Sequence, residues 1–160
     1  MKALILFLAF IAGIHNSYAM PLAGHGIHLD LSQSWELNSF REYSSINDVT
    51  EWVYKVDDAT LIVTKTKCSH CKDISQKNAD EFNFHKEFST SALLINLNGI
   101  NALYTVHESP KQVFTRTLTI NIEGYQYGIQ QSMSTDVPFA RASHMERLFF
   151  GIINSFRIND

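Results

Sequence analysis

Apolar and polar side chains alternate along several segments of the chain, as they do in β-strands that bury one face. The segment Thr60–Lys67 begins apolar and ends in lysines, which makes it a poor candidate for a central parallel strand, because such strands are apolar throughout. The pattern therefore favours an antiparallel sheet. Trp35 is expected to anchor the irregular segment after the first strand. These alternating strands are predicted at Gly26–Leu31, Glu51–Val56, Thr60–Lys67 and Gln112–Ile122.

Turn signals join the second half of the sheet into an antiparallel meander. Asn98 and Gly99 form the strongest hairpin signal in the chain, because both residue types tolerate positive φ. Glu123 and Gly124 are expected to turn the chain again. The strands of the meander are predicted at Ser91–Leu97, Ile100–Glu108, Gln112–Ile122 and Tyr125–Ser134.

The clearest helix signal follows Pro138, where apolar residues recur at steps of three and one. Proline in the first turn of a helix costs no hydrogen bond, because the N–H groups there have no partner within the helix. Phe150 lies off the apolar stripe, either as an exposed aromatic residue or as a second packing contact. The stripe consists of Ala142, Met145, Leu148, Phe149, Ile152, Ile153 and Phe156.

The segment Asp73–Phe88 has only a weak helical pattern. A helix around Asn78–Phe88 is expected to pack through Phe82 and one of Phe84 or Phe88. Antiparallel strands with helices laid on the sheet make an α+β fold, and this is the fold class that the whole pattern predicts, with a long C-terminal helix.

The first residues have the features of a secretory signal peptide. A short positive start precedes the apolar run Ala3–Ile14, and small residues follow at Ser17 and Ala19. The run is shorter than the roughly 20 residues that a membrane-spanning helix needs. We therefore expect residues 1–19 to be removed, leaving residues 20–160 as a single α+β domain without a transmembrane segment. The protein would be exported, and either periplasmic or secreted.

Composition and charge exclude several functions. The formal net charge is −3 and the pI is about 6.1, whereas nucleic-acid-binding domains usually carry a strong basic excess. No glycine-rich phosphate loop and no Gly-x-Ser-x-Gly motif occurs, so we predict no catalytic residues and no cofactor. Positive charge gathers around the cysteines, as a solvated strand end or as a docking patch for an acidic partner. Its members are Lys65, Lys67, Lys72 and Lys77.

The chain has only two cysteines, Cys68 and Cys71, in the sequence Lys-Cys-Ser-His-Cys-Lys. In an exported protein, two cysteines most often oxidise to each other, so a local structural disulfide is the favoured interpretation. A redox-active dithiol is the second. Metal binding is the third, with His70 and His85 as weak candidates to complete the site, because zinc requires four ligands and the motif supplies two.

Several segments together resemble the Mog/PsbP-like fold family, which includes bacterial envelope proteins, PsbP-type photosystem proteins and the Mog-type nuclear transport factor. The segment GIHLDLSQSW resembles the opening strand, LNGINALYTVHES a later strand, TRTLTINIEGYQYGIQQSM the hairpin, and RLFFGIINSFRI the final helix. This resemblance implies an α-β-α sandwich. It also implies a binding or assembly role without a shared catalytic set, and a partner that is another envelope protein or a target outside the cell.

A rival resemblance is to thioredoxin, because DDATLIVTKTKCSHCK resembles a strand followed by a Cys-x-x-Cys motif and a helix. It implies that Cys68 is the nucleophile, activated at a helix N-terminus, and that Cys71 resolves the mixed disulfide. The polar strand end before Cys68 and the weak helical pattern after Cys71 argue against it. We therefore predict an exported, non-enzymatic binding or assembly module, with a thioredoxin-like thiol-disulfide oxidoreductase as the alternative.

Overall fold

The computed structural model of the chain describes residues 27–31, 35–44, 48–84, 90–109 and 113–158. The proposed signal peptide and the first residues after it lie outside these ranges. Within them, the elements in chain order are β1 (Ile27–His28), β2 (Glu36–Tyr43), β3 (Val49–Val56), β4 (Ala59–Lys67), α1 (Gln76–Phe84), β5 (Thr90–Leu97), β6 (Ile100–Ser109), β7 (Val113–Ile122), β8 (Tyr125–Ser134), α2 (Phe139–Ser155) and β9 (Arg157–Ile158).

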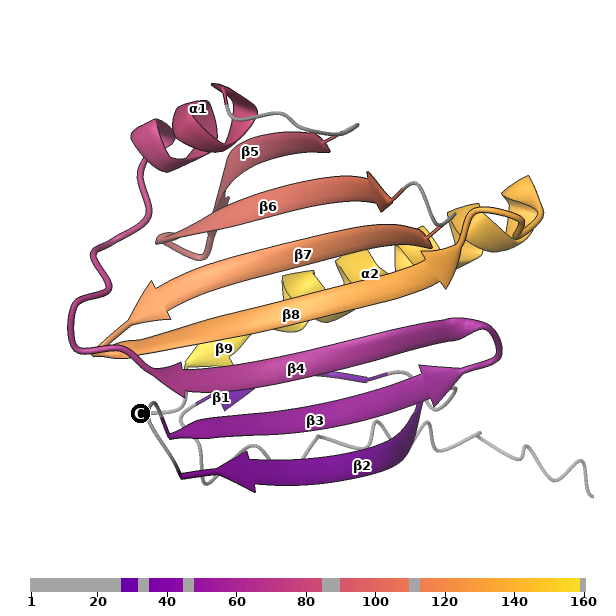
Figure 1. Cartoon of the computed structure of the whole chain (residues 1–160), viewed down its shortest axis with the longest axis horizontal. Coiled ribbons are helices and arrows are strands. Elements are labelled where there is room, and N and C mark those ends of the chain that lie inside the picture. Colours follow the sequence, from indigo (N-terminus) through magenta and orange to yellow (C-terminus); the bar gives the residue numbers. More distant parts are fainter. Residues whose placement is uncertain (1–26, 32–34, 45–47, 85–89, 110–112, 159–160) are drawn as a thin grey trace, which may run out of the picture.

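A seven-stranded sheet in the order β2-β3-β4-β8-β7-β6-β5 forms the centre of the molecule, and all its neighbouring strands are antiparallel (Figure 1). After β4 the chain leaves the middle of the sheet, forms α1 and enters the far edge as β5. It then returns strand by strand through the meander until β8 pairs with β4. The predicted α+β class, with an antiparallel sheet flanked by helices and a long C-terminal helix, is confirmed.

The turns of the meander lie where the sequence placed them. Asn98 and Gly99 have φ values of 53° and 91°, and Glu123 and Gly124 have φ values of 49° and 81°. Glycine is the residue type that adopts positive φ without steric cost, which explains the second position of both turns. The hairpins β5–β6 and β7–β8 therefore form as predicted.

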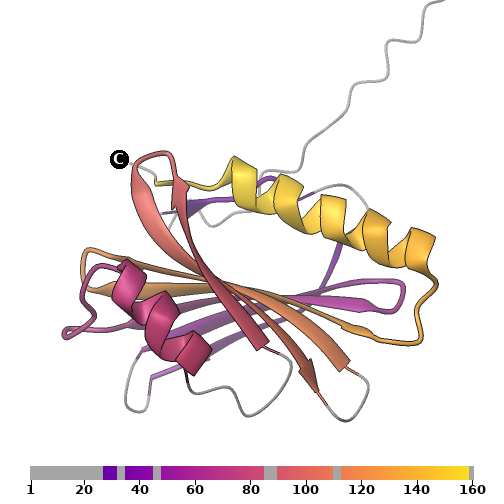
Figure 2. The same cartoon turned by 90° about the horizontal axis from the view of Figure 1, so that it is seen from above.

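The two helices lie on opposite sides of the sheet, as Figure 2 shows. The predicted apolar stripe packs α2 against one face, and its neighbours in the sheet are fully buried residues such as Leu61, Leu118 and Ile129. Phe150 makes the second packing contact, with its ring centroid 5.6 Å from that of Tyr104. The buried members of the stripe are Met145, Phe149, Ile152, Ile153 and Phe156, with Ala142 and Leu148 partly buried beside them.

The other face of the sheet is polar, and Figure 1 is seen from that side, with α2 behind the strands. Because side chains alternate along each strand, the residues between the core positions of β4, β7 and β8 point to this face. They are mostly small hydroxyl and amide residues of intermediate exposure: Thr60, Thr64, Thr66, Thr115, Thr117, Thr119, Gln126, Gln130 and Ser132.

Helix α1 differs from its prediction in its bounds and its contacts. It begins at Gln76 and its buried residue is Ala79, whereas Phe82, expected to pack, is 39% exposed. The Asn83 side chain instead holds the helix to the sheet edge, since it donates to the carbonyl of Ala92 and accepts from its N–H, both at 2.9 Å. The side chain of Phe84 and residues 85–89 lie outside what the structure describes, so the expected contact of Phe84 or Phe88 stays a prediction.

The N-terminal region contains the main strand that the sequence did not reveal. Strand β2 forms an edge of the sheet and is exposed along almost its whole length. Its register shifts between Leu37 and Ser39, which breaks the period of two that identifies strands. The strand predicted at Gly26–Leu31 is shorter than expected, because only Ile27 and His28 pair with β9. Trp35 is buried, as expected for an anchor.

None of the helices in the described ranges is long and apolar enough to cross a membrane.

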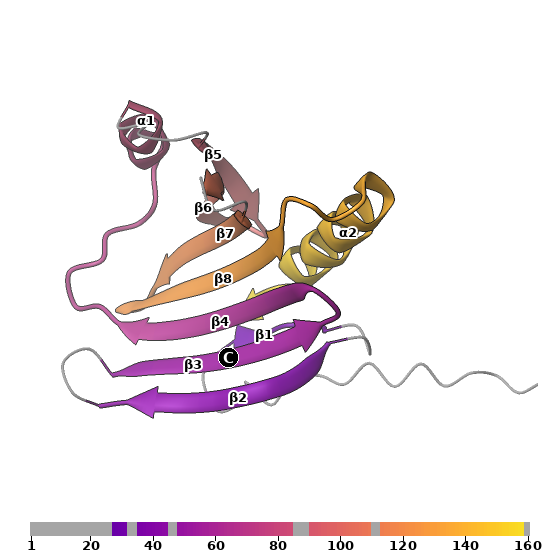
Figure 3. The ribbon, with the colours of Figure 1, turned by 45° about the vertical axis from the view of Figure 1, so that its right-hand side comes forward.

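The small sheet of β1 and β9 lies on the same side of the main sheet as α2, as Figure 3 shows. This side of the molecule is therefore closed by packed elements, while the polar side carries α1 near β5. The predicted site residues Cys68, His70 and Cys71 lie at the end of the sheet where β4 stops and the chain crosses toward α1.

Candidate functional site

The cysteine motif lies at the end of β4, beside the β7–β8 turn. Cys68 and Cys71 lie at disulfide-bonding distance, with Cα atoms 5.4 Å apart. The backbone N–H of Cys68 donates to the carbonyl of Gly124 at 2.7 Å, and the Gln126 amide donates to the Cys71 sulfur at 3.9 Å. These contacts fix the motif to the turn. That its role is structural rather than redox stays a prediction.

The motif does not stand at the N-terminus of a helix, because α1 begins only at Gln76. The helix dipole that would activate Cys68 in a thioredoxin-like site is therefore not in place. His70 is exposed, and His85 lies outside the described residues. A disulfide offers no thiolate to zinc. Within the described ranges, no three His, Cys, Asp or Glu side chains gather as metal ligands would.

The lysines near the motif do not act as one patch, because most of them are engaged locally. Burial also lowers the pKa of Lys65, which lies among aromatic rings. Lys72 is exposed beside the disulfide. The local contacts are Lys65 Nζ over the ring of Tyr125 at 4.1 Å, Lys67 Nζ with the Asp48 carboxylate at 3.6 Å, and Lys77 Nζ with the Glu81 carboxylate at 3.5 Å.

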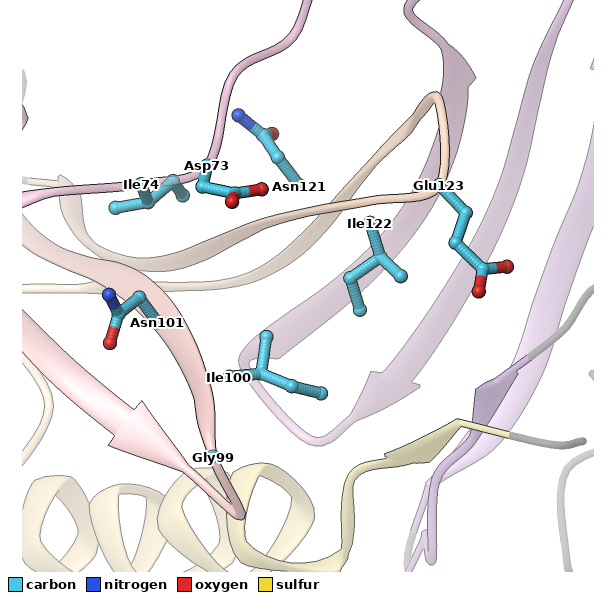
Figure 4. A pocket seen from close by; sticks show the side chains of 8 residues that line it. All are labelled: Asp73, Ile74, Gly99, Ile100, Asn101, Asn121, Ile122 and Glu123. Carbon is cyan, nitrogen blue, oxygen red and sulfur yellow. The ribbon is translucent and has the colours of Figure 1, made fainter.

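Residues 68–75 connect β4 to α1 and are called the crossing segment here. A cavity of about 290 Å³ opens next to the disulfide, where the crossing segment passes the β5–β6 and β7–β8 turns (Figure 4). It approaches the lower end of the range for small-molecule pockets, roughly 300–1,000 Å³. The carboxylate of Asp73 points from the crossing segment toward Asn121 of β7. The lining residues are Asp73, Ile74, Gly99, Ile100, Asn101, Asn121, Ile122 and Glu123.

The cavity exists because β6 and β7 separate at this end of the sheet. Their pairing runs from Ser109–Val113 to Ala102–Ile120 and then stops. Continuing the same register would pair Asn101 with Asn121 and Ile100 with Ile122, and all four of these residues line the cavity. Edges of two strands that would normally bond to each other therefore face the cavity instead.

Side-chain hydrogen bonds hold the two turns apart. The Asn98 amide donates to the carbonyl of Phe156 at 3.4 Å, which draws the β5–β6 turn toward the end of α2. The Asn121 amide donates to the carbonyl of Lys72 at 2.7 Å, which fixes the β7–β8 hairpin to the crossing segment. Gln126 supports it by donating to the Asn121 side-chain oxygen at 3.2 Å. The shape of the cavity is thus preformed.

The described lining of the cavity contains carboxylate, amide and apolar side chains. Among the described residues, the Asp73 carboxylate has no hydrogen bond or ion pair. None of the described residues that line the cavity is a histidine, cysteine, serine or lysine, so no nucleophile or matched base from these residues stands beside that carboxylate. Oxygen-bearing side chains occupy one part of the wall, and Ile74, Ile100 and Ile122 form an apolar part.

A second cavity, of about 230 Å³, lies near the start of α2 and includes Arg116 in its lining. Arg116 is only 6% exposed. Its guanidinium donates to the Gln131 amide oxygen at 3.0 Å and lies 3.5 Å from the Glu146 carboxylate. Gln131 in turn donates to the carbonyl of Met145 at 3.0 Å. This group fastens α2 to the sheet, and its charge is already paired.

Sequence reasoning identified neither the cavity residues nor the buried Arg116 cluster. Arg116 had a usable signal, because it is in phase with Leu118 and Ile120 on the face that the alternation assigns to the core. The cavity had none, since its members come from a crossing segment and two turns that are far apart in sequence. Of the predicted site residues, Cys68, Cys71 and His70 lie next to the cavity without lining it.

No protein-family model and no curated protein sequence matches the chain. Similar solved structures include a crystal structure of a protein from Bacteroides thetaiotaomicron VPI-5482, with 10% identity and a TM-score of 0.50 over 86% of this chain. This chain spans 46% of the length of that protein. The solution structure of cyanobacterial PsbP (CyanoP) from Synechocystis sp. PCC 6803 has 14% identity and a TM-score of 0.49, over 95% of this chain and 99% of that one.

Both likenesses concern the fold alone.

Proposed function

We propose that this chain is an exported, non-enzymatic binding or assembly module, whose partner is another protein of the cell envelope or a target outside the cell. The observation that carries the proposal is the preformed cavity between β6 and β7. Its walls are held by side-chain hydrogen bonds from Asn98 and Asn121, so a partner group enters a site that is already shaped. A site of this kind loses little conformational entropy on binding.

Export is supported independently of the cavity. The charged start, the apolar run Ala3–Ile14 and the small residues at Ser17 and Ala19 fit a cleaved signal peptide. An oxidised Cys68–Cys71 pair suits an oxidising compartment, since cytosolic thiols are kept reduced. Cleavage is tested by N-terminal sequencing of the protein from the envelope or culture medium of the source organism. The mature chain is expected to begin at Met20, and a retained Met1 in the cytosol would contradict export.

The binding role is tested by site-specific photo-crosslinking in intact cells. A photoreactive residue replaces Asn101 at the wall of the cavity. As a control, it replaces Lys55 of β3, which is exposed at the end of the sheet away from the cavity. We expect one defined adduct from position 101 and none from position 55. Equal labelling from both positions, or no adduct from either, would contradict a partner at this end of the sheet.

A further inference from the structure

The open strand edges in the cavity suit a ligand with peptide-like groups. The main chains of Ile100–Asn101 and Asn121–Ile122 lie opposite each other without the pairing that their register would allow. Each exposed edge presents N–H and C=O groups that bond well to another backbone. A short piece of polypeptide satisfies such edges, as in other sites where an extended peptide adds to a sheet.

The charge of the lining selects a cationic group. Asp73 and Glu123 contribute carboxylates, Asn101 and Asn121 contribute amides, and the part of the lining that the structure describes includes no lysine, arginine or histidine. The Asp73 carboxylate is directed toward Asn121 at the open edge of β7, and no described residue is paired with it. An ammonium group would form a charge-assisted hydrogen bond there. An anion would meet carboxylates and no cation of the lining.

The remaining wall is apolar, which adds a third requirement. Ile74 is buried at 5% exposure, and Ile100 and Ile122 are partly buried against the core. An aliphatic side chain on the ligand would cover this surface and remove it from water, at about 25 cal/mol per Å² of apolar area. A bare metal ion makes no use of it, and only two carboxylates, those of Asp73 and Glu123, stand among the described lining residues, whereas calcium requires six to eight oxygen ligands.

We propose that the cavity captures the N-terminal residue of a partner polypeptide. The α-ammonium group lies at Asp73, the first peptide group lies between the open edges of β6 and β7, and an aliphatic first side chain lies on the isoleucines. This inference rests on the proposed binding function and names the part of the partner that the cavity takes. It needs no covalent step, and it assigns the disulfide next to the cavity a supporting role through the crossing segment.

The test uses the purified, oxidised protein and short synthetic peptides, followed by NMR titration of backbone amides. The probe is Leu-Gly-amide, and the matched control is N-acetyl-Leu-Gly-amide, which differs by the loss of the ammonium charge. We expect saturable shifts at Asp73, Gly99, Asn101 and Glu123 with the free amine, and at least tenfold weaker binding of the acetylated peptide. Binding should also weaken above pH of about 8, because an α-amino group loses its proton there.

Variants separate the ammonium contact from general damage. Asp73→Asn keeps size and removes the charge, so it should weaken Leu-Gly-amide binding at least tenfold. Glu108→Gln, at the second cavity, removes a carboxylate elsewhere and should leave binding unchanged. Asn101→Trp should fill the cavity and abolish binding while the fold, judged by circular dichroism, is retained.

Several outcomes would overturn the inference. Equal binding of the acetylated peptide, tighter binding of N-acetyl-lysine-amide, or calcium producing the same shifts would each reject the N-terminal amine. If no peptide binds while crosslinking from position 101 persists, the inference fails and the proposed function stands. If the peptide binds and no crosslinked partner is found, the proposed function loses its support while the cavity keeps its ligand class.

Discussion

Removal of the buried guanidinium of Arg116 tests how α2 is attached to the sheet. The guanidinium is nearly enclosed, donates to Gln131, faces Glu146 and lies over the ring of Phe114 at 4.6 Å. Arg116→Met keeps an unbranched apolar stem of similar reach and deletes the charge. The change leaves the Gln131 oxygen without its donor, and an unsatisfied buried acceptor costs about 1–3 kcal/mol.

The magnitude follows from which groups remain unpaired. Arg116→Met returns Glu146 to solvent, where 47% of its side chain is already exposed, so the cost stays near about 1–3 kcal/mol. Gln131→Leu removes the acceptor of one buried Arg116 N–H group and the side-chain donor to the carbonyl of Met145, and we expect about 2–5 kcal/mol. Because both changes break the same hydrogen bond, the double variant should cost less than the sum of the single ones.

Urea unfolding, followed by tryptophan fluorescence and far-ultraviolet circular dichroism, measures these free energies. Glu146→Gln serves as the surface comparison, with an expected loss of about 1 kcal/mol or less, since half-exposed ion pairs contribute little. The reasoning is refuted if Arg116→Met is neutral while Gln131→Leu keeps its full cost, or if the two changes add without any interaction energy.

Three further predictions concern the core, the disulfide and pH. Ile152→Asp should unfold the protein or nearly so, because it places a charge at a site with 2% exposure; an unchanged melting temperature would show that the stripe is not core. Cys68→Ser with Cys71→Ser should change stability little, because the small ring contributes little loop-closure entropy; rapid reduction of insulin disulfides by the native protein would favour the redox alternative instead. Burial raises the pKa of Tyr54 to about 12 from an ordinary 10, so the stability that its neutral form contributes is present below pH of about 10 and is lost as pH rises toward 12. Tyr54→Phe should flatten this alkaline loss in a pH series of melting curves, and an identical slope would reject the assignment.

The strands and the long helix were predictable because burial in them follows a local period. In β7, Leu118 and Ile120 face the core at every second residue, and in α2 the buried residues follow the helical repeat. Strand β2 was not predictable for the same reason. It is an edge strand with little burial, and its bulge at Leu37 and Ser39 shifts the period halfway along. In helix α1, Phe82 is exposed and the side chain of Asn83 bonds the helix to the sheet edge, which an apolar pattern does not reveal.

The candidate site was only partly predictable. The cysteines could be identified from the sequence, because two cysteines three positions apart form a structural disulfide, a redox-active dithiol or part of a metal site. The cavity depends on where the pairing of β6 with β7 stops, and the alternation of Asn101 and Asn121 with their neighbours continues past that point without a sign of it. Only the folded chain places Asp73 opposite these residues.

The separation of β6 and β7 argues for use of the cavity on energetic grounds. Two residue pairs of the antiparallel register are absent there, and each backbone hydrogen bond contributes on the order of 1 kcal/mol. The Asn98 and Asn121 bonds to neighbouring main chains offset part of this cost, yet they do so by holding the turns apart rather than by closing the ladder. Proteins tend to violate local consistency where a function requires it. A ligand that restores backbone pairing at these edges would recover the stabilisation that the free sheet lacks, which is the strongest reason to seek a peptide-like partner at this end of the molecule.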